Sequence, residues 1–179
     1  SDPATFAPYN RNPETLARQW AIPGIQGLEH RVGGLEKEDG SGSVSQDPLN
    51  HQKMVEIRRD KIERIARDIP PALVEGESNG DLLLVSWGST YGAAKTAFDT
   101  LRNEGHKLSF LNLKYLNPMP LNMAEVLKGF KRILIPEMNL GQLKMIIQSK
   151  YLAAVNGLHK VQGIPFKAIE IENKLREML

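Results

Sequence analysis

The stretch Asp81–Thr96 constrains the fold more than any other part of this 179-residue chain. Four consecutive apolar residues, Leu82–Val85, lead through Gly88 into a segment with a helical pattern. The apolar residues of that segment recur three to four positions apart: Ala94, Ala97, Phe98 and Leu101. A continuous apolar run followed directly by an amphipathic helix is typical of a parallel strand that is buried on both faces.

The same alternation of strand and helix continues to the end of the chain. We predict strands at Leu82–Ser86, Leu108–Leu113, Ile133–Ile135 and Phe166–Ile171. We predict helices at Thr90–Glu104, Met123–Phe130, Leu140–Ala154 and Glu172–Met178. Strands that alternate with helices favour right-handed crossovers and a mainly parallel sheet with helices on both faces. The sequence therefore predicts a three-layer α/β/α domain over residues 72–179.

The first 46 residues have no periodic apolar pattern and are interrupted by Pro8, Pro13, Pro23 and paired glycines. Such a stretch buries too little apolar surface to order by itself, so we expect residues 1–46 to be an extended arm. Asp47 and Pro48 form a helix-start signal, and Pro70-Pro71 form a stop signal, which predicts a linking helix over 47–71. Because the chain starts at Ser1 rather than Met, we expect it to be part of something longer.

The composition narrows the possible functions. The chain has no cysteine, which excludes disulfides, thiolate metal sites and cysteine nucleophiles, and we expect no metal site and a cytoplasmic location. A net charge of +2 gives no electrostatic reason for a nucleic-acid partner or an anionic membrane. No apolar run approaches the ~18 residues of a membrane span, and no secretory leader is visible at the start.

The turn after Leu82–Ser86 resembles a phosphate-binding loop without matching one. Gly88 and Gly92 are separated by three residues instead of four, and Lys95 is displaced so that it points away from the loop. The glycine pattern of dinucleotide-binding proteins is absent as well. We predict that Gly88 makes the tight turn, Ser89 caps the helix, and Gly92 lets the helix pack closely; weak anion binding at Gly88 and Ser89 is the alternative.

The turn after Ile133–Ile135 has its own capping pattern. We expect Asn139 to be the N-cap of the next helix, with Gln142 reaching back to it. Asn139 and Gly141 are the second candidate for weak anion binding. The carboxylate of Glu137 is a base, a partner contact or an acceptor of backbone amides from the 139–141 turn, and we favour the last.

Several motifs together resemble one family. In the second half they are Pro136-Glu137-Met138-Asn139-Leu140-Gly141-Gln142 and Lys150-Tyr151-Leu152, and in the first half they are Trp20-Ala21-Ile22-Pro23-Gly24, the segment 27–40 that starts Gly-Leu-Glu-His-Arg, and the segment 47–54. They resemble the C-terminal domain of the transketolase superfamily, and more closely the α subunit of 2-oxoacid:ferredoxin oxidoreductases of the 2-oxoglutarate type. The resemblance covers nearly all of the chain and implies a fifth strand that the sequence does not locate.

The resemblance implies a role within an enzyme complex. Such enzymes oxidatively decarboxylate a 2-oxoacid on thiamine diphosphate, pass electrons through an iron–sulfur cluster to ferredoxin, and release an acyl-CoA. In the family an upstream thiamine-binding domain of the α chain and the β subunit carry the cofactors, Mg included. This sequence lacks the upstream region, so the resemblance implies a C-terminal fragment that packs subunits together, binds no cofactor tightly, and is inactive alone.

The arm holds the remaining candidates for chemistry. Glu29, His30 and Arg31 would place an imidazole and a guanidinium near a 2-oxoacid carboxylate, or they belong to an adhesive loop without a chemical role. Two other classes of function stay open: a free-standing anion or nucleotide-binding module, and the C-terminal domain of another thiamine diphosphate enzyme. The arm motifs argue against the latter. Which 2-oxoacid is used is not determined by these residues.

Overall fold

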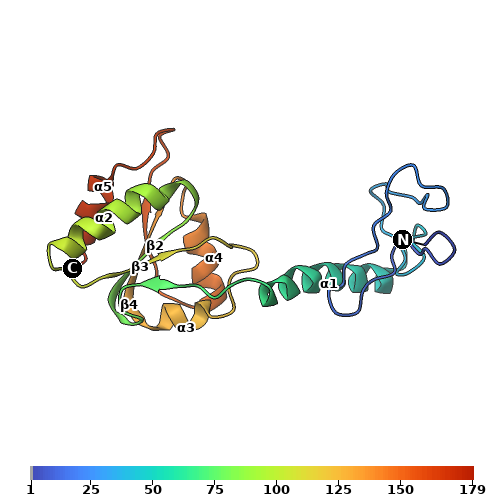
Figure 1. Cartoon of the computed structure of the whole chain (residues 1–179), viewed down its shortest axis with the longest axis horizontal. Coiled ribbons are helices and arrows are strands. Elements are labelled where there is room, and N and C mark those ends of the chain that lie inside the picture. Colours follow the sequence, from blue (N-terminus) through green and yellow to red (C-terminus); the bar gives the residue numbers. More distant parts are fainter. Residues whose placement is uncertain (1) are drawn as a thin grey trace. The chain divides into compact units, whose positions relative to one another are not determined.

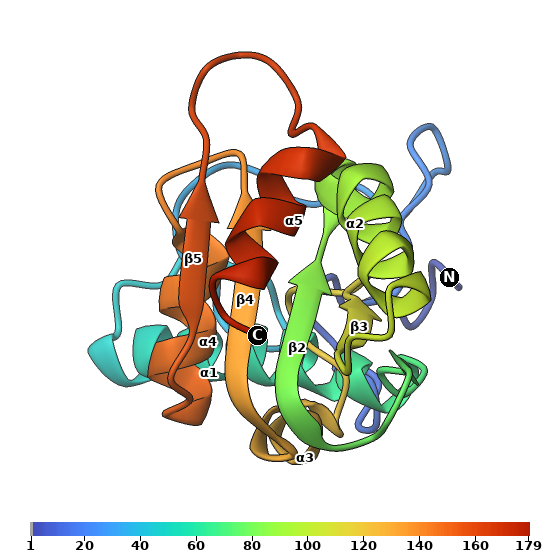
Figure 2. The same cartoon turned by 90° about the vertical axis from the view of Figure 1, so that its left-hand side faces the viewer.

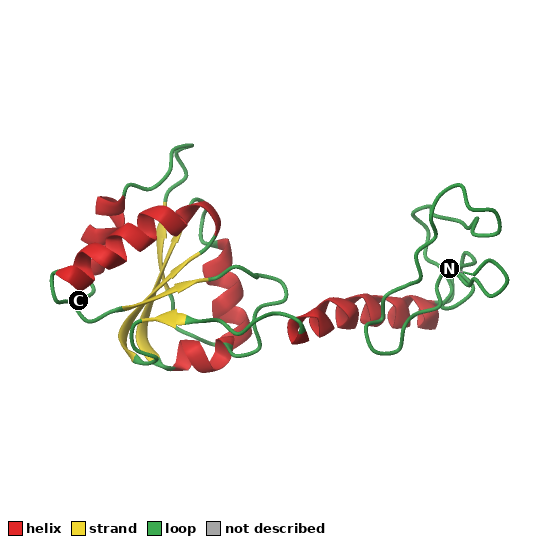
Figure 3. Ribbon diagram, viewed as in Figure 1, coloured by secondary structure: helices red, strands yellow, loops and turns green. Residues whose placement is uncertain are grey.

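The computed structural model describes residues 2–179, which divide into two compact units between Asp68 and Ile69. We refer to them as unit 1 and unit 2 (Figures 1 and 3). None of the helices in the described residues has the length and apolarity that a membrane span requires.

Unit 2 is built on a five-stranded sheet with the order β1-β3-β2-β4-β5. The strands are β1 (Val74–Glu75), β2 (Gly80–Ser86), β3 (Ser109–Asn112), β4 (Phe130–Glu137) and β5 (Asn156–His159). Strands β3, β2, β4 and β5 run parallel (Figure 2). The two-residue β1 pairs antiparallel with β3 at one edge of the sheet. The predicted mainly parallel sheet is confirmed.

Helices cover both faces of this sheet. The helices α2 (Tyr91–Asn103) and α5 (Ala168–Arg176) pack on one face, and α3 (Met123–Lys128) and α4 (Gln142–Tyr151) pack on the other (Figure 1). Leu82, Leu84 and Leu134 point into the first layer, whereas Leu83 and Ile133 point into the second. Leu84 and Leu134 are completely buried. The apolar run in β2 is continuous because both of its faces are covered.

The prediction for the C-terminal part was wrong. Residues 166–171 do not form a strand, because α5 begins at Ala168 and includes most of the segment assigned to a final helix. The buried side chains of Ile171, Leu175 and Met178 are spaced four and three residues apart, which is a helical period. The parallel strand at this edge is instead β5, and β1 is the antiparallel strand at the other edge.

The turn after β2 differs in part from the expectation. Gly88 has a φ of +54° and makes the tight turn as predicted. Thr90 rather than Ser89 is the residue before α2, and its hydroxyl caps no helix amide but donates to the Trp87 carbonyl and accepts from the Trp87 amide. A Cβ added at Gly92 would meet no atom within 4 Å, so the predicted role of Gly92 in close packing was wrong.

Unit 1 consists of the arm and helix α1 (Pro48–Arg64), which continues as one 3₁₀ turn, Ile65–Arg67. Asp47 caps α1 by accepting from the Leu49 amide at 3.0 Å, as predicted. Within residues 2–46 the described backbone forms no helix or extended strand. Isolated β-bridges connect the arm to itself at Tyr9–Gly40, Arg11–Arg18 and Lys37–Val44.

We expect a broad-specificity protease at low dose to cut first at Gly40–Ser45. Gly40 and Gly42 have positive φ values of 79° and 73°, and Ser41 and Ser43 are exposed, as at typical sites of nicking. The exposed loop 161–164 of unit 2 is the internal control. The ammonium of Lys160 restrains this loop by binding the Pro165 carbonyl and the Glu170 carboxylate. Mass spectrometry of the first fragments checks the order, and equal protection of both loops would show that the arm is integral to its unit.

Candidate functional site

The structure places Glu29, His30 and Arg31 at the wall of one pocket within unit 1. The pocket has a volume of about 520 Å³, and the arm segments around Phe6 and around Ser41–Val44 complete it. A Cβ on Gly42 would lie 2.7 Å from the Pro8 side chain, so a glycine is required for this close approach. The three candidate residues therefore face a hollow that the arm forms by folding back on itself.

The polar atoms around this pocket have distinct roles. The Glu29 carboxylate accepts from the Gly27 amide at 2.7 Å and so holds its own turn. His30 Nδ1 lies 3.0 Å from the Leu28 carbonyl, which accepts, so the proton is on Nδ1 and Nε2 is the remaining ring nitrogen. Arg31 is exposed and forms no ion pair with the described residues. The pocket thus offers one uncompensated guanidinium beside an oriented imidazole.

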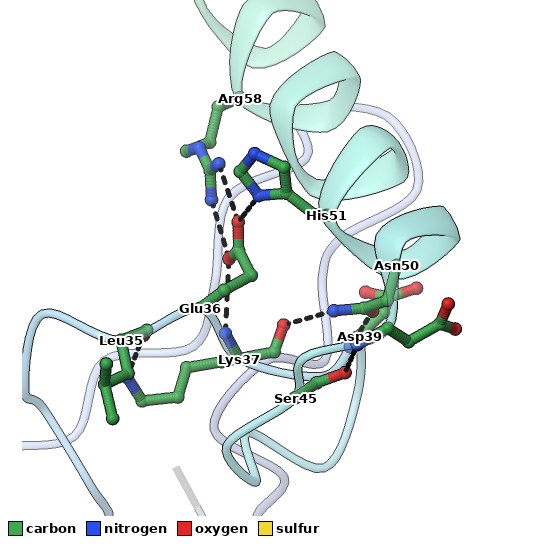
Figure 4. A network of polar contacts seen from close by, with 9 residues as sticks. Leu35, Glu36, Lys37, Asp39, Ser45, Asn50, His51 and Arg58 are labelled. Carbon is green, nitrogen blue, oxygen red and sulfur yellow. Dashed lines mark hydrogen bonds and ion pairs between the residues drawn. The ribbon is translucent and has the colours of Figure 1, made fainter.

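A carboxylate fixes the loop behind the pocket to α1. Glu36 accepts from Arg58 through two parallel hydrogen bonds of 3.1 and 3.0 Å, and from His51 Nδ1 at 2.8 Å (Figure 4). The hydrogen bonds from Arg58 are the main reason that the pKa of Glu36 falls to about 2, and the hydrogen bond from His51 contributes. We call Glu36, His51 and Arg58 the arm clasp. A paired fork of this kind fixes orientation as well as distance.

Lys37 adds a second attachment next to the arm clasp. Its side chain is almost completely buried, and its ammonium donates to the carbonyls of Gly33 and Leu35. Asn50 on α1 donates to the Lys37 carbonyl at 2.9 Å and accepts from the Asp39 amide at 3.1 Å (Figure 4). The glycine pair at 33–34 therefore lies beside a buried cation that no sequence pattern indicated.

In unit 2 the candidate residues lie together at the carboxyl ends of the two central strands; they are Gly88, Ser89, Asn139 and Gly141. Gly88 and Ser89 follow β2, and Asn139 and Gly141 follow the neighbouring parallel strand β4. The chain leaves β2 toward β3 on one side and leaves β4 toward β5 on the other, so this is the topological switch point. The Ser89 hydroxyl lies 3.6 Å from the Met138 sulfur, which joins the two turns.

Glu137 is completely buried, and its carboxylate binds backbone amides in the first turn of α4. Its two oxygens accept from the amides of Leu143 at 2.8 Å and Lys144 at 3.1 Å. Its predicted role as an acceptor of backbone amides is confirmed, but the amides are one turn further along than the 139–141 turn that we expected. A carboxylate at a helix start is also favoured by the positive end of the helix dipole.

Asn139 accepts the two earlier amides of the same helix start. Its Oδ1 lies 2.7 Å from the Gly141 nitrogen and 3.0 Å from the Gln142 nitrogen. Gly141, at a φ of 93°, is the residue that precedes the helix, so Gln142 is the first helical residue and does not reach back as predicted. Internal oxygens thus occupy the amides of residues 141–144, which disfavours anion binding at Asn139 and Gly141.

Two further groups at the carboxyl ends of the strands were not predicted from the sequence. The imidazole of His159 at the end of β5 lies directly over Gly141 and Gly157, where added Cβ atoms would lie 2.6 and 2.2 Å from its Nε2. The indole Nε1 of Trp87 is buried and has no hydrogen-bond acceptor among residues 2–179. The sequence indicates neither the position of the His159 ring nor the burial of the Trp87 indole, because both depend on which strands become neighbours.

The side chains of this sequence do not supply the ligands for the iron–sulfur cluster or the metal ion of the enzymes that it resembles. An iron–sulfur cluster is held by thiolates, and the sequence has no cysteine. Within residues 2–179, no group of three or more histidine and acidic side chains could hold a metal ion. We therefore assign no step of a reaction to a metal held by this chain.

Comparison with known proteins places these features in a family. The pyruvate:ferredoxin oxidoreductase core domain II family matches residues 80–173, over half of the chain. The 2-oxoglutarate oxidoreductase subunit KorA of Mycobacterium tuberculosis is 46% identical over 97% of this chain and 26% of its own length. The 2-oxoglutarate synthase subunit KorA of Methanothermobacter thermautotrophicus is 27% identical over 98% of this chain and 47% of its own length.

A solved structure agrees with the sequence relatives. The 2-oxoglutarate:ferredoxin oxidoreductase from Magnetococcus marinus, solved with 2-oxoglutarate, coenzyme A and succinyl-CoA bound, has a TM-score of 0.86 at 28% identity. The match covers 97% of this chain and 31% of that one, so the chain spans less than half of the length of each of these relatives. On the match to residues 80–173, which contains the parallel sheet and the Glu137 turn, this chain belongs to the pyruvate:ferredoxin oxidoreductase core domain II family.

Proposed function

We propose that this chain is part of the α subunit of a cytoplasmic 2-oxoglutarate:ferredoxin oxidoreductase and that its role there is structural. The observation that carries the proposal is the 46% identity to KorA of Mycobacterium tuberculosis across 97% of the chain, the arm included. In this proposal residues 1–46 are an arm, 47–71 a linking helix, and 72–179 the domain that packs against an upstream thiamine-binding domain and the β subunit. Thiamine diphosphate, Mg, the iron–sulfur cluster and CoA are bound elsewhere in the complex.

The distribution of apolar residues in unit 1 supports a packing role. The arm exposes Trp20, Ile22, Val32 and Leu35, with relative exposures between 57% and 85%. Soluble proteins rarely leave several large apolar side chains of one segment in water unless a partner covers them. An arm of this kind fits a surface on the same enzyme better than a free-standing module.

The arm pocket supports a second, finer role. A 2-oxoacid with two carboxylates needs a cation that recognises the carboxylate remote from the reacting carbon, and Arg31 is a guanidinium that forms no ion pair in the described part of the chain. His30 lies beside it with Nε2 available. As the alternative to a purely structural arm, we propose that Glu29 holds the turn while His30 and Arg31 contact the substrate carboxylate in the assembled enzyme.

The proposed function is tested by assaying the complex that contains this chain. We expect CoA-dependent reduction of ferredoxin with 2-oxoglutarate, and a lower kcat/KM with pyruvate. An assembled complex that reduces ferredoxin with neither 2-oxoacid would overturn the assignment, whereas a preference for pyruvate would overturn only the choice of substrate.

Replacing Arg31 with methionine is expected to raise the KM for 2-oxoglutarate at least about tenfold, the usual effect of losing a hydrogen bond to a charged group. The kcat should change little, because Arg31 would bind the remote carboxylate in ground state and transition state alike. Arg67→Met is the matched control, since Arg67 is also exposed in unit 1 and has no ion pair with the described residues. Equal KM values for both variants would support the adhesive-loop interpretation instead.

A further inference from the structure

We propose that a groove at the carboxyl ends of β2 and β3 binds a small molecule that joins an anionic group to a flat apolar body. The proposal concerns unit 2 alone and is independent of the proposed function. It uses Trp87, Asn112 and Lys114, none of which belongs to the arm pocket or to the Glu137 turn. We call this hollow the strand-end groove.

The strand-end groove consists of two connected hollows. One has a volume of about 430 Å³ and is lined by Trp87, Asn112, Lys114 and Leu116. The other has a volume of about 370 Å³ and lies along Pro70, Phe110 and Tyr115. Tyr91, Asn112, Leu113 and Lys114 line both hollows, so they share a wall. Each volume lies in the range of about 300–1,000 Å³ that is usual for ligand pockets.

The first hollow presents hydrogen-bond donors without acceptors. Trp87 Nε1 has no acceptor among the described residues, but it is buried and not open to a ligand, so the indole serves here as a wall of the hollow. Asn112 uses its Oδ1 to accept from the Ser86 hydroxyl at 3.2 Å, which leaves its NH₂ group as the free part of the amide. Lys114 is exposed and forms no ion pair with the described residues. The Asn112 amide and the Lys114 ammonium, both at the end of β3, would be satisfied together by an oxyanion such as a phosphate or a carboxylate.

The charges around the groove favour an anion. No acidic residue lines the first hollow. Glu75 is the acidic residue that lines the second, and its carboxylate is paired with the ammonium of Lys95 at 2.7 Å. Lys114 is therefore the charge along this wall that is not compensated within the described residues, and an anionic group would be attracted to the first hollow.

The second hollow has the walls that a flat apolar group requires. Tyr91 and Tyr115 expose 44% and 45% of their surface, and the Tyr91 ring leans on Phe110 with a centroid distance of 6.2 Å. Pro70 adds a further apolar surface. A ligand with its anion at Asn112 and Lys114 would extend its body along these rings.

The strand-end groove can be tested through tryptophan fluorescence. The chain has two tryptophans, Trp20 and Trp87, so Trp20→Phe leaves Trp87 as the only indole emission. We expect phenyl phosphate or benzoate, at constant ionic strength, to cause a saturable change in that emission. The better of the two identifies the preferred anion. Inorganic phosphate has the anion without the ring, and benzyl alcohol has the ring without the anion. Each should bind at least tenfold more weakly than the better probe.

Two lysine variants decide whether the groove is the site. Lys114→Met should weaken binding of the better probe at least about tenfold, as expected for a charged hydrogen bond. Lys107→Met should leave it unchanged, because Lys107 is an exposed lysine at the opposite end of β3. Calorimetry on Trp87→Phe and on the unmodified chain gives a readout that does not depend on fluorescence. No saturable binding, equal binding of benzyl alcohol, or equal loss in both lysine variants would overturn the proposal.

Discussion

Glu137→Gln is expected to lower the free energy of unfolding of unit 2 by about 3 kcal/mol. Both oxygens of the buried Glu137 carboxylate accept from backbone amides of α4, whereas glutamine has one oxygen and an NH₂ group that would face the Lys144 amide. The loss combines about 1.5–3 kcal/mol for a hydrogen bond to a charged group with the cost of an unpaired buried donor. Chemical denaturation followed by circular dichroism measures the change.

A matched control separates burial from charge at a helix start. Glu125 lies exposed in the first turn of α3, and Glu125→Gln should cost no more than about 1 kcal/mol, the upper end for an exposed charge near a helix start. In the assembled enzyme Glu137→Gln should leave kcat nearly unchanged if the carboxylate is structural. A thousandfold fall in kcat with assembly intact would instead make Glu137 a catalytic residue.

Gly141→Val is expected to destabilise unit 2 by about 3 kcal/mol or more, because backbone strain and steric overlap each contribute roughly 1–3 kcal/mol. Gly141 has a φ of 93°, which a β-branched residue adopts only under strain. Its new Cβ would also lie 2.6 Å from His159 Nε2. Thermal and chemical unfolding of the variant measure the combined effect.

Two further variants divide the effect of Gly141→Val into its parts. His159→Ala in the same chain should recover the steric part and leave the backbone part. Gly92→Ala tests a helical glycine with open space around it, and alanine there should be neutral or stabilising by up to about 1 kcal/mol. If Gly141→Val were as harmless as Gly92→Ala, the left-handed turn would not be required for the start of α4.

The central elements of unit 2 were predictable because local pattern and burial agree there. In β2 every residue from Leu82 to Ser86 is buried, and α2 buries the four residues that the helical spacing selected. Strand β5 was missed because Asn156–His159 has one large apolar residue and lies at a sheet edge, where pairing and not composition defines the strand. Residues 166–171 mix apolar residues with Lys167 and Glu170, and six positions are too few for the pattern to separate a strand from a helix.

The candidate site was predictable only where partners are close in sequence. Asn139 and Glu137 bind amides two to seven residues away, and the sequence indicated acceptors at both positions. The arm clasp joins Glu36 to Arg58 across 22 residues, and no periodic pattern encodes a contact between a loop and a helix at that distance. The buried Trp87 donor depends on how β2 and β3 pair, which local sequence does not determine.

The arm clasp has a consequence for how the enzyme would assemble. In residues 2–68 the buried apolar side chains are Leu28, Met54 and Ala66, a core too small to hold a segment of this length by hydrophobic burial. Polar contacts such as that of Glu36 with Arg58 fix the orientation of the arm loop on α1 but add little net stability in water. The arm would then gain most of its order as its partner covers it, so that docking and folding become one step, marked by a large negative change in heat capacity on association.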